Sequence, residues 1–580
     1  MYCSYRLSIF AFLFMGLFSA LTAQKAGRDN VRLAYRVLEE RPEVTISFTI
    51  TSMEQLRPLS RILSVDNVEG NRVTAVANRR QLEQFLYLEK DFEVVLPEKK
   101  VAGAPKSLSS FGVPYWNSYP SYQQYDSIMH RFATDFPEIC RLHSIGKSRN
   151  GKDIFFVKIS DNVDEDEPEP EFMYSSTMHG DEVVGYVLLI RLISYLLENY
   201  ATDTLVGRLV NRMEIWINPL ANPDGTYFST DQDVSTAIRY NANAVDLNRN
   251  FPDPAEGPHP DGNSYQPETV AMMDFMEQHD FVLSANIHGG AEVMNYPWDT
   301  WYPAFPDYKP HADKIWFENI CREYVDSAQT YGPQGYMNDL NNGVVNGSEW
   351  YSISGGRQDY ITYFHQGREV TIEISNKKGP PDAPGDTLPY YWEYNYRSLV
   401  HFMEQALFGV RGTVKDAITG EPVNALISIP GHDRENSQVY SDPVHGFFTR
   451  LINEGSYTME FTAEGYAPLL IENVTVSQRQ TTFLHVEMEP SGTGVHLPEA
   501  SPFRIYPNPA GDRITIASDI PGEPFCEINI FTLAGSVLYS ERFSPVCIKS
   551  ISISSLPQGI YVVEVASATS VYRMKLHKTY

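Results

Sequence analysis

Two patterns of apolar and polar residues divide the chain. In its central part, short apolar runs of strand length occur in "DIFFVKI", "EFMYSST", "MEIWINP", "FVLSANIH" and "REVTIEIS". Longer segments between them, such as "VVGYVLLIRLISYLLENY" and "PETVAMMDFMEQH", repeat their apolar residues at helical spacing. Strands that alternate with helices predict an α/β domain over residues 113–408, with a mixed, mostly parallel sheet flanked by helices.

The segments on either side of this domain have different patterns. Residues 24–112 hold strand-like runs ("EVTISFTI", "NRVTAVA") and a helical run ("NRRQLEQFLYLE"), which predict a small α+β domain. Residues 409–489 and residues 504–580 consist of short alternating strands and turns, and each predicts a β-sandwich. Residues 490–503 between the two have the composition of a linker.

The first residues have the pattern of a secretory signal peptide. One Arg precedes an apolar run from Leu7 to about Leu21, and small residues follow, so we expect removal of residues 1–23. The run is short for a spanning helix, and no other segment is apolar enough to cross a membrane. We therefore expect an exported protein without a transmembrane segment.

Composition narrows the classes of function. A formal net charge of −27 disfavours nucleic acid, whose phosphates need a basic surface, and leaves room for a cationic substrate. The cysteines have no thiolate zinc spacing, although Cys526 and Cys547 share one domain and leave a disulfide possible.

Three residues are candidate metal ligands. His179 and Glu182 lie three apart in "STMHGDEVVGY", where an apolar strand gives way to a helix, and His288 ends the strand "FVLSANIH" before two glycines. Imidazole and carboxylate are normal zinc ligands, and a catalytic zinc needs three protein ligands and an open position. Alone, a His-x-x-Glu pair more often has a structural role, in capping or packing a helix. The presence of His288 in the same domain favours metal binding instead.

Other polar residues fit the surroundings of such a metal. The loop "IRYNANAVDLNRNFPD" supplies Arg239, Asn248 and Arg249, which suit an anionic substrate group. Glu373 stands inside the apolar strand "REVTIEIS", where a carboxylate is costly unless it is paired or functional, and it is a candidate general base. Tyr351, in "EWYSISGGRQDY", is a candidate for closing over a substrate.

The order His-x-x-Glu, Asn-Arg, His, Tyr, Glu resembles the zinc metallocarboxypeptidases of the funnelin family. Their regulatory branch, with carboxypeptidases N, E, M and D, carries stretches like "NANAVDLNRNFPD", "SANIHGG", "EWYSISGG" and "EVTIEIS". The resemblance implies the carboxypeptidase fold and one Zn²⁺ held by His179, Glu182 and His288. It also implies that Arg239, Asn248 and Arg249 bind the terminal carboxylate and polarise the scissile carbonyl. Tyr351 would cover the bound residue, and Glu373 would be the catalytic base.

Substrate preference follows from the same resemblance. In the basic-specific members an Asp follows the third zinc ligand by eleven residues, which corresponds to Asp299 in "NYPWD", and a Gln corresponds to Gln358. A carboxylate at the end of the pocket favours a C-terminal Lys or Arg. Arg357 would neutralise Asp299 if its side chain turned inward, and Asp299 could instead cap a turn.

The flanking domains also resemble known modules. Residues 409–489 resemble the transthyretin-like sandwich that follows the catalytic domain in this branch, and residues 24–112 stand where digestive-type relatives carry an inhibitory propeptide. The tail, with "IYPNPAGDRITI" and "LPQGIYVVEV", resembles the sorting domain of the type IX secretion system. This implies export past the outer membrane to the cell surface or medium, with the secretion machinery as a partner.

The sequence therefore predicts a secreted, monomeric zinc carboxypeptidase that acts on peptide and protein C-termini and releases Lys or Arg. Two alternatives stay open. One is an endopeptidase of the same fold acting on cell-wall peptides, which would lack the clamp made by Asn248 and Arg249. The other is a non-catalytic surface-binding module, which would have lost ligands or the base.

Overall fold

The structure, a computed structural model, describes residues 28–88, 90–96, 117–301, 309–379, 388–491, 503–518, 524–532, 535–567 and 571–579. Its residues form two compact units, divided between Glu489 and Pro490. The expected signal peptide and most of the expected linker lie outside the described residues.

An eight-stranded sheet forms the centre of residues 117–408, here called the central domain, and its strand order is β11-β10-β12-β9-β7-β8-β6-β5. The inner strands β12, β9, β7 and β8 run parallel to one another, whereas β10 pairs with β12, and β6 with both β8 and β5, in antiparallel fashion. The predicted mixed, mostly parallel sheet is confirmed. The strands are β5 (Cys140–Lys147), β6 (Asp153–Ile159), β7 (Glu171–Ser176), β8 (Glu214–Asn218), β9 (Phe281–His288), β10 (Ala291–Tyr296), β11 (Val344–Asn346) and β12 (Arg368–Ser375).

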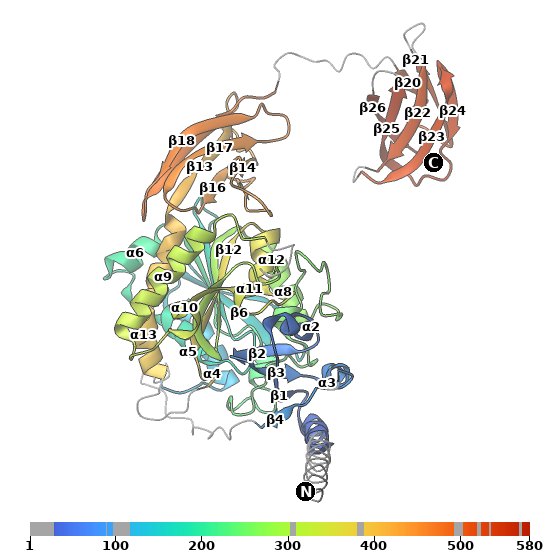
Figure 1. Cartoon of the computed structure of the whole chain (residues 1–580). Coiled ribbons are helices and arrows are strands. Elements are labelled where there is room, and N and C mark those ends of the chain that lie inside the picture. Colours follow the sequence, from blue (N-terminus) through green and yellow to red (C-terminus); the bar gives the residue numbers. More distant parts are fainter. Residues whose placement is uncertain are drawn as a thin grey trace, which may run out of the picture. The chain divides into compact units, whose positions relative to one another are not determined.

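Helices cover both faces of this sheet (Figure 1). Successive strand residues point to opposite faces, so Phe155 and Phe172 join one apolar core while Phe156 and Met173 join the other. The first core packs against α4 (Tyr122–Asp135), α5 (Val184–Asn199), α6 (Thr204–Val210), α9 (Lys314–Tyr331) and α13 (Leu388–Glu404). The second packs against α8 (Pro267–Met276) and α12 (Arg357–Phe364). Short helical segments complete the domain: α7 (Pro223–Thr226), η2 (Leu247–Arg249), α10 (Asp339–Gly343), α11 (Gly347–Trp350) and η3 (Gln405–Leu407).

Residues 28–96, here called the N-terminal domain, form an antiparallel sheet of order β2-β3-β1-β4 with helices on it. Its elements are a helix over residues 28–40, β1 (Val44–Thr49), η1 (Met53–Gln55), α2 (Leu56–Ser60), β2 (Ser64–Glu69), β3 (Arg72–Ala77), α3 (Arg79–Leu86) and β4 (Glu93–Val95). Asn78 and Gln81 form a capping box at the start of α3, which fixes that helix where its sequence predicts it.

Residues 409–489, here called the first sandwich, contain a three-stranded and a four-stranded sheet. The strands are β13 (Gly409–Asp416), β14 (Leu426–Ser428), β15 (Val439–Tyr440), β16 (Phe447–Arg450), β17 (Gly455–Thr462), β18 (Leu469–Val476) and β19 (Thr481–Met488). The carboxylate of Asp313 in the central domain accepts hydrogen bonds from Arg368 of the same domain and from Arg450 of the first sandwich, at 2.8 Å each. This fully buried cluster joins the two domains.

The second unit is also a β-sandwich, with three strands in one sheet and four in the other. Its strands are β20 (Phe503–Tyr506), β21 (Arg513–Ser518), β22 (Phe525–Phe531), β23 (Val537–Val546), β24 (Ile548–Ser552), β25 (Gly559–Ser567) and β26 (Val571–Lys578). Cys526 and Cys547 are free thiols. Among the described residues no single helix is long and apolar enough to span a membrane, and only the sharply bent pair α5 and α6 passes on length and composition.

Candidate active site

Three residues from two neighbouring strands meet at the carboxyl edge of the sheet. His179 and Glu182 follow β7, and His288 is the last residue of the adjacent, parallel strand β9. The Nδ1 atom of His179 lies 3.0 Å from Glu182 Oε1, and Nδ1 of His288 lies 2.8 Å from Glu182 Oε2. All three side chains are buried. We call them the metal triad.

The turn that brings the triad together depends on Gly180. A Cβ atom at this position would lie 2.4 to 2.6 Å from backbone atoms of Gly225, Thr226 and Ile238, so no larger residue fits. The next residue, Asp181, has a second contact, because its carboxylate accepts a hydrogen bond from Lys378 at 3.2 Å. The motif "HGDE" therefore sets both the turn and part of the electrostatics of the site.

The donor set of the triad suits a cation. Nε2 of His179 lies 3.1 Å from Asp246 Oδ1, and when it donates there, the Nδ1 lone pair of His179 faces Glu182 and Nδ1 of His288, 3.1 Å away. Burial lowers the pKa of His288 to about 4, so its imidazole is neutral at pH 7. Nε2 of His288 has no hydrogen-bond partner among the described residues. Burial and Arg239 lower the pKa of His179, but Glu182 and Asp246 raise it above its usual value, so without a metal a proton on His179 takes the place of a cation beside the carboxylate oxygens.

Arg239 and Asp246 support the triad from the side. Arg239 donates to Asp246 through Nε at 3.0 Å and to Glu182 through Nη1 at 3.3 Å, and its side chain is 3% exposed. Burial opposes ionisation of Asp246, but Arg239 and His179 hold the pKa of this carboxyl well below its usual range. Asp246 therefore stays ionised and orients both the imidazole and the guanidinium.

Glu373 lies beside the triad because of strand register. In the parallel pair of β12 and β9, Glu373 is the direct partner of His288. Its Oε2 atom is buried and has no hydrogen-bond partner among the described residues. Burial, together with the carboxylates of Glu182 and Asp66, raises the pKa of Glu373 well above its usual range. A carboxyl group with a raised pKa and a free oxygen is suited to accept and return a proton.

The three other predicted contact residues lie around the same small cavity, which has a volume of about 30 Å³. Asn248 and Arg249 come from η2, and the amide oxygen of Asn248 accepts a hydrogen bond from the backbone of Arg357 at 3.0 Å. Nε of Arg249 has no partner among the described residues. Tyr351 is half-buried at the other side of the cavity, and its hydroxyl lies 3.5 Å from the carbonyl oxygen of Val65.

Asp299 also lines this cavity, with its side chain buried. Gln358 donates to Asp299 Oδ1 at 3.0 Å, so the two predicted specificity residues are in contact. A Cβ atom at Gly347 would lie 1.7 Å from that same oxygen, so any larger residue at this position would displace the carboxylate of Asp299. Arg357 does not neutralise Asp299, because its guanidinium donates to Glu369 at 3.0 and 3.1 Å. Burial raises the pKa of Asp299 to about 7, while Arg249 lowers it.

The N-terminal domain covers the site. Asp66 Oδ1 accepts hydrogen bonds from Arg239 Nη1 at 2.9 Å and from Lys378 Nζ at 2.6 Å. Asp66 is the extra residue of a β-bulge in β2, since Val65 and Asn67 pair with neighbouring residues of β3. A bulge re-aims a side chain, and here the carboxylate of Asp66 reaches the guanidinium beside the metal triad. The backbone of Val65 occupies the space in front of Arg249 and Tyr351.

Further contacts fix this domain on the loop that carries Arg239. Glu43 accepts hydrogen bonds from the backbone N–H groups of Arg239 and Tyr240, at 3.0 and 3.1 Å. Ser60 donates to the carbonyl oxygen of Ser352 at 2.7 Å, next to Tyr351. These contacts, and the remaining volume of about 30 Å³, leave room for little more than one water molecule.

Comparisons with known proteins agree with this geometry. The zinc carboxypeptidase family model matches residues 125–398, and the secretion system C-terminal sorting domain model matches residues 504–579. The catalytic chain of carboxypeptidase N from Rattus norvegicus is 33% identical over 430 residues, which cover 68% of this chain and 92% of that protein. The chain belongs to the zinc carboxypeptidase family.

Two further matches were found. Carboxypeptidase D from Mus musculus is 40% identical over 359 residues, and the chain spans about a quarter of that protein, 25% of its length. The crystal structure of carboxypeptidase A from Helicoverpa armigera matches with 20% identity and a TM-score of 0.48, over 63% of this chain and 97% of that one.

Membership of this family makes Zn²⁺ the cofactor, and the His-Glu-His group in the structure fits it. The predicted resemblance to zinc carboxypeptidases and to a type IX sorting tail is thereby confirmed. The sorting domain marks the protein for export to the cell surface or the extracellular space.

Three functional neighbours were missed by the sequence reasoning: Asp246, Lys378 and Asp66. Asp246 stands in the quoted motif "NAVDLNRN", two residues before Asn248, and its spacing could have identified it. Lys378 lies three residues after "REVTIEIS", but whether its side chain reaches the site depends on the turn after β12. No local sequence pattern identifies Asp66, since its position in the site depends on contact between two domains.

Proposed function

We propose that this chain is a secreted zinc carboxypeptidase that hydrolyses the last peptide bond of peptides and proteins and releases Lys or Arg. The observation that carries the proposal is the convergence of the metal triad, Glu373, Arg239 and the η2 residues on one cavity. Zn²⁺, when bound, supplies a Lewis acid that polarises a carbonyl and lowers the pKa of water.

Each side chain of the site has a separate role in the proposed reaction. Asn248 and Arg249 bind the terminal carboxylate of the substrate, because a forked guanidinium and a neutral amide fit a carboxylate without burying an unpaired charge. Arg239 faces the developing negative charge on the scissile carbonyl oxygen with its Nη1 group. Glu373 takes a proton from the attacking water and then gives it to the leaving amine. Tyr351 covers the bound residue.

Asp299 and Gln358 support the preference for a basic side chain. A buried carboxylate that Arg357 does not neutralise favours an incoming ammonium or guanidinium group. The contact with Gln358 uses one oxygen of Asp299 and fixes the plane of the carboxylate, which leaves the second oxygen for the ligand.

We also propose that the N-terminal domain is an inhibitory propeptide. Asp66 binds the guanidinium group of Arg239, which the reaction requires. The carbonyl oxygen of Val65 lies in front of Arg249 and Tyr351. Removal of residues 24–112 would open the site. Export then proceeds through the type IX secretion machinery, which recognises residues 504–580, and the mature enzyme acts as a monomer.

The two alternatives receive less support. An endopeptidase has no terminal carboxylate to bind, yet Asn248 and Arg249 both line the cavity. A non-catalytic binding module has no use for a buried, unpartnered carboxylate oxygen beside a metal set, and Glu373 provides one.

An assay on matched peptides tests the proposal. Peptides that end in Arg, Lys, Phe or Glu are incubated with the protein after removal of the N-terminal domain, with and without a zinc chelator. We expect release of Arg or Lys, loss of activity with the chelator, and loss of activity in Glu373→Gln. Full activity in Glu373→Gln, or in the presence of the chelator, would overturn the mechanism, while preference for Phe would overturn only the role of Asp299.

A further inference from the structure

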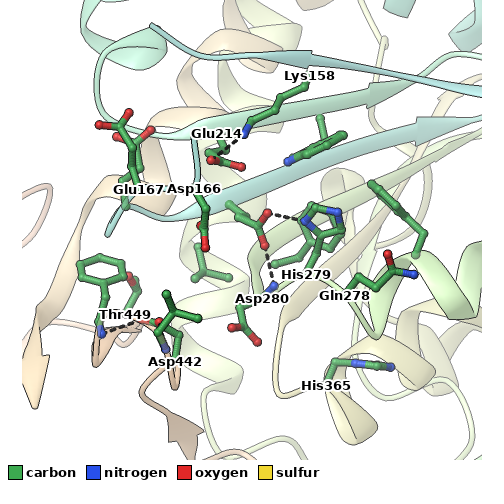
Figure 2. A pocket seen from close by; sticks show the side chains of 18 of the residues that line it. Lys158, Asp166, Glu167, Glu214, Gln278, His279, Asp280, His365, Asp442 and Thr449 are labelled. Atoms are coloured by element: carbon green, nitrogen blue, oxygen red, sulfur yellow. Dashed lines mark hydrogen bonds and ion pairs between the residues drawn. The ribbon is translucent and has the colours of Figure 1, made fainter. Parts of the chain in front are cut away.

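A second cavity, of about 1110 Å³, lies at the opposite edge of the central sheet from the metal triad. It is lined by residues where β7, β8, β9 and β12 begin, by the end of α8 and by residues 439–451 of the first sandwich (Figure 2). The strand β9 runs from Phe281 in the cavity to His288 in the triad, so roughly 23 Å separates the two sites.

The lining of this acidic cavity is strongly and unevenly charged. Eleven of its residues are Asp or Glu and three are Lys or Arg. Two of the three cations are already paired, Lys158 with Glu214 at 2.7 Å and Arg141 with Asp164 at 2.7 Å. The third, Arg368, is bound to Asp313 of the domain junction, outside the cavity. Histidines of the lining contact four more carboxylates, those of Glu171, Glu277, Asp166 and Asp442. Five carboxylates have no Lys, Arg or His partner among the described residues of the lining: Glu165, Glu167, Glu169, Asp274 and Asp280.

Two carboxyl groups show the effect of this crowding. Burial, together with the carboxylates of Glu167 and Asp161, raises the pKa of Glu169 to about 8, and its Oε1 atom has no partner among the described residues. Burial, with the nearby carboxylates of Glu171 and Asp442, also raises the pKa of Asp280. Glu169 is therefore largely protonated at pH 7, and a cationic ligand would displace this proton and relieve the repulsion between the carboxylates.

Charge alone does not describe the cavity, because buried uncharged groups also lack partners there. The indole Nε1–H of Trp216 and the hydroxyl of Thr449 are without hydrogen-bond partners among the described residues, although the two side chains are only 3% and 6% exposed. Both residues line the cavity, and an indole N–H can only donate. A ligand that satisfies Trp216 must therefore present a hydrogen-bond acceptor as well as a positive charge.

Apolar side chains supply another part of the wall. Phe275, Phe281 and Phe447 line the cavity with several valines, and such surfaces pack against the methylene stems of long basic side chains. A polyamine offers positive charge and methylene groups but no acceptor. A peptide that contains Lys or Arg offers all three, because its main-chain carbonyl groups accept hydrogen bonds.

We propose that the acidic cavity is a binding site for a Lys- or Arg-containing peptide segment, separate from the carboxypeptidase site. Positive side chains of the segment face the unpaired carboxylates, and a main-chain carbonyl accepts the hydrogen bond from Trp216. The occupant is an extended piece of a basic protein rather than its C-terminus, because each Lys and Arg of the described lining already binds a carboxylate and none is left for a terminal carboxylate.

Binding of a probe that cannot enter the carboxypeptidase site tests the proposal. The probe is a fluorescein-labelled decapeptide of alternating Lys and Ala with a C-terminal amide, measured by fluorescence anisotropy on the full chain in 50 mM NaCl. We expect saturable binding that a peptide of acetylated Lys and Ala does not compete, and that weakens with salt. Absence of saturable binding would overturn the proposal.

Variants locate the bound probe. In Glu169→Gln/Asp280→Asn, affinity should fall about tenfold or more, whereas the control Glu464→Gln/Glu472→Gln removes two exposed carboxylates of the first sandwich outside the cavity and should change affinity less than twofold. Equal losses in both pairs would mean non-specific attraction to an acidic protein and would refute the site.

The role of the indole N–H needs its own variant. Trp216→Phe keeps an aromatic ring but removes the donor, so probe affinity should fall about threefold or more while spermine binding stays unchanged. If Trp216→Phe binds the probe as the parent chain does, and spermine competes as well as the peptide does, the peptide assignment is wrong. Thermal unfolding of each variant shows that the fold is retained.

Discussion

Removal of the Asp66 carboxylate should activate the full chain. In Asp66→Ala, the N-terminal domain loses the two hydrogen bonds, at 2.9 and 2.6 Å, that hold Arg239 and Lys378. The Asp66 side chain is 14% exposed and that of Arg239 is 3% exposed, so the pair is screened little by solvent. Lys378 keeps its contact with Asp181, but Arg239 Nη1 is left with only a longer contact to Glu182.

The magnitude follows from what such truncations cost. Removing one partner of a buried, hydrogen-bonded charge pair weakens association by roughly 2 to 4 kcal/mol. At about 1.4 kcal/mol per tenfold, the open state of the full chain becomes roughly 30- to 700-fold more populated. Glu43 and Ser60 still hold the domain on the site, so part of the population stays closed in the variant.

The assay compares hydrolysis of an Arg-ending peptide by the full chain, by Asp66→Ala and by Glu83→Ala. Glu83 lies exposed on α3 of the same domain and serves as the matched control. We expect at least about tenfold more activity for Asp66→Ala, approaching that of the chain without its N-terminal domain, and no change for Glu83→Ala. A parent chain that is already as active as the chain without the domain would refute inhibition by the N-terminal domain.

Three other substitutions test separate parts of the structure. Glu373→Gln should lower kcat about 10²- to 10⁴-fold with little change in KM for the Arg-ending peptide. A change in KM as large as the change in kcat would contradict a role as base. Asp299→Ala should lower kcat/KM about 10- to 150-fold for Arg-ending but not for Phe-ending peptides; an equal loss for both would assign Asp299 a structural role. Asp313→Asn should lower the free energy of unfolding of the central domain and first sandwich by about 3 to 5 kcal/mol at pH 7 in urea denaturation. Arg450 and Arg368 hold the pKa of Asp313 well below its usual value although burial opposes this, so its contribution is present above about pH 3.9 and declines by about 1.4 kcal/mol per pH unit below it. A difference between the two proteins that is the same at pH 7 and pH 3 would contradict that assignment.

The elements that carry the metal triad could be predicted because their sequences are locally unambiguous. The apolar runs "FVLSANIH" and "REVTIEIS" coincide with β9 and β12, and the helical run after His179 coincides with α5 apart from its ends. Parallel pairing of β9 with β12 then places Glu373 beside His288. Sequence reasoning therefore reached the His-Glu-His set and the candidate base.

Other elements gave weaker local signals. The edge strand β5 and the long helix α9 contain polar residues that obscure their periods, because each has a solvent-facing side. The strand β10 is almost wholly buried, and its polar residues Glu292 and Asn295 interrupt the apolar run that would identify it. β2 was also missed, and its bulge at Asp66 breaks the alternation that identifies a strand. That irregularity is the feature that directs Asp66 into the site.

Contacts between domains could not be predicted from local patterns. The sequence left open whether Arg357 turns toward Asp299, and the answer depends on Glu369, twelve residues further along at the start of β12. The acidic cavity likewise forms only where residues 439–451 of the first sandwich lie against the central domain. Such features depend on the packing of elements far apart in the chain.

The most direct test of the central claim is the identity of what the protein releases. A peptide ending in a free Arg carboxylate, its C-terminal amide and its Phe-ending counterpart are incubated with the chain without its N-terminal domain, and the products are identified by mass spectrometry. We predict release of a single Arg from the free acid alone, loss of this release with a zinc chelator, and its recovery on addition of Zn²⁺. Cleavage at an internal bond, or equal hydrolysis of the amide, would contradict a zinc carboxypeptidase that binds the terminal carboxylate.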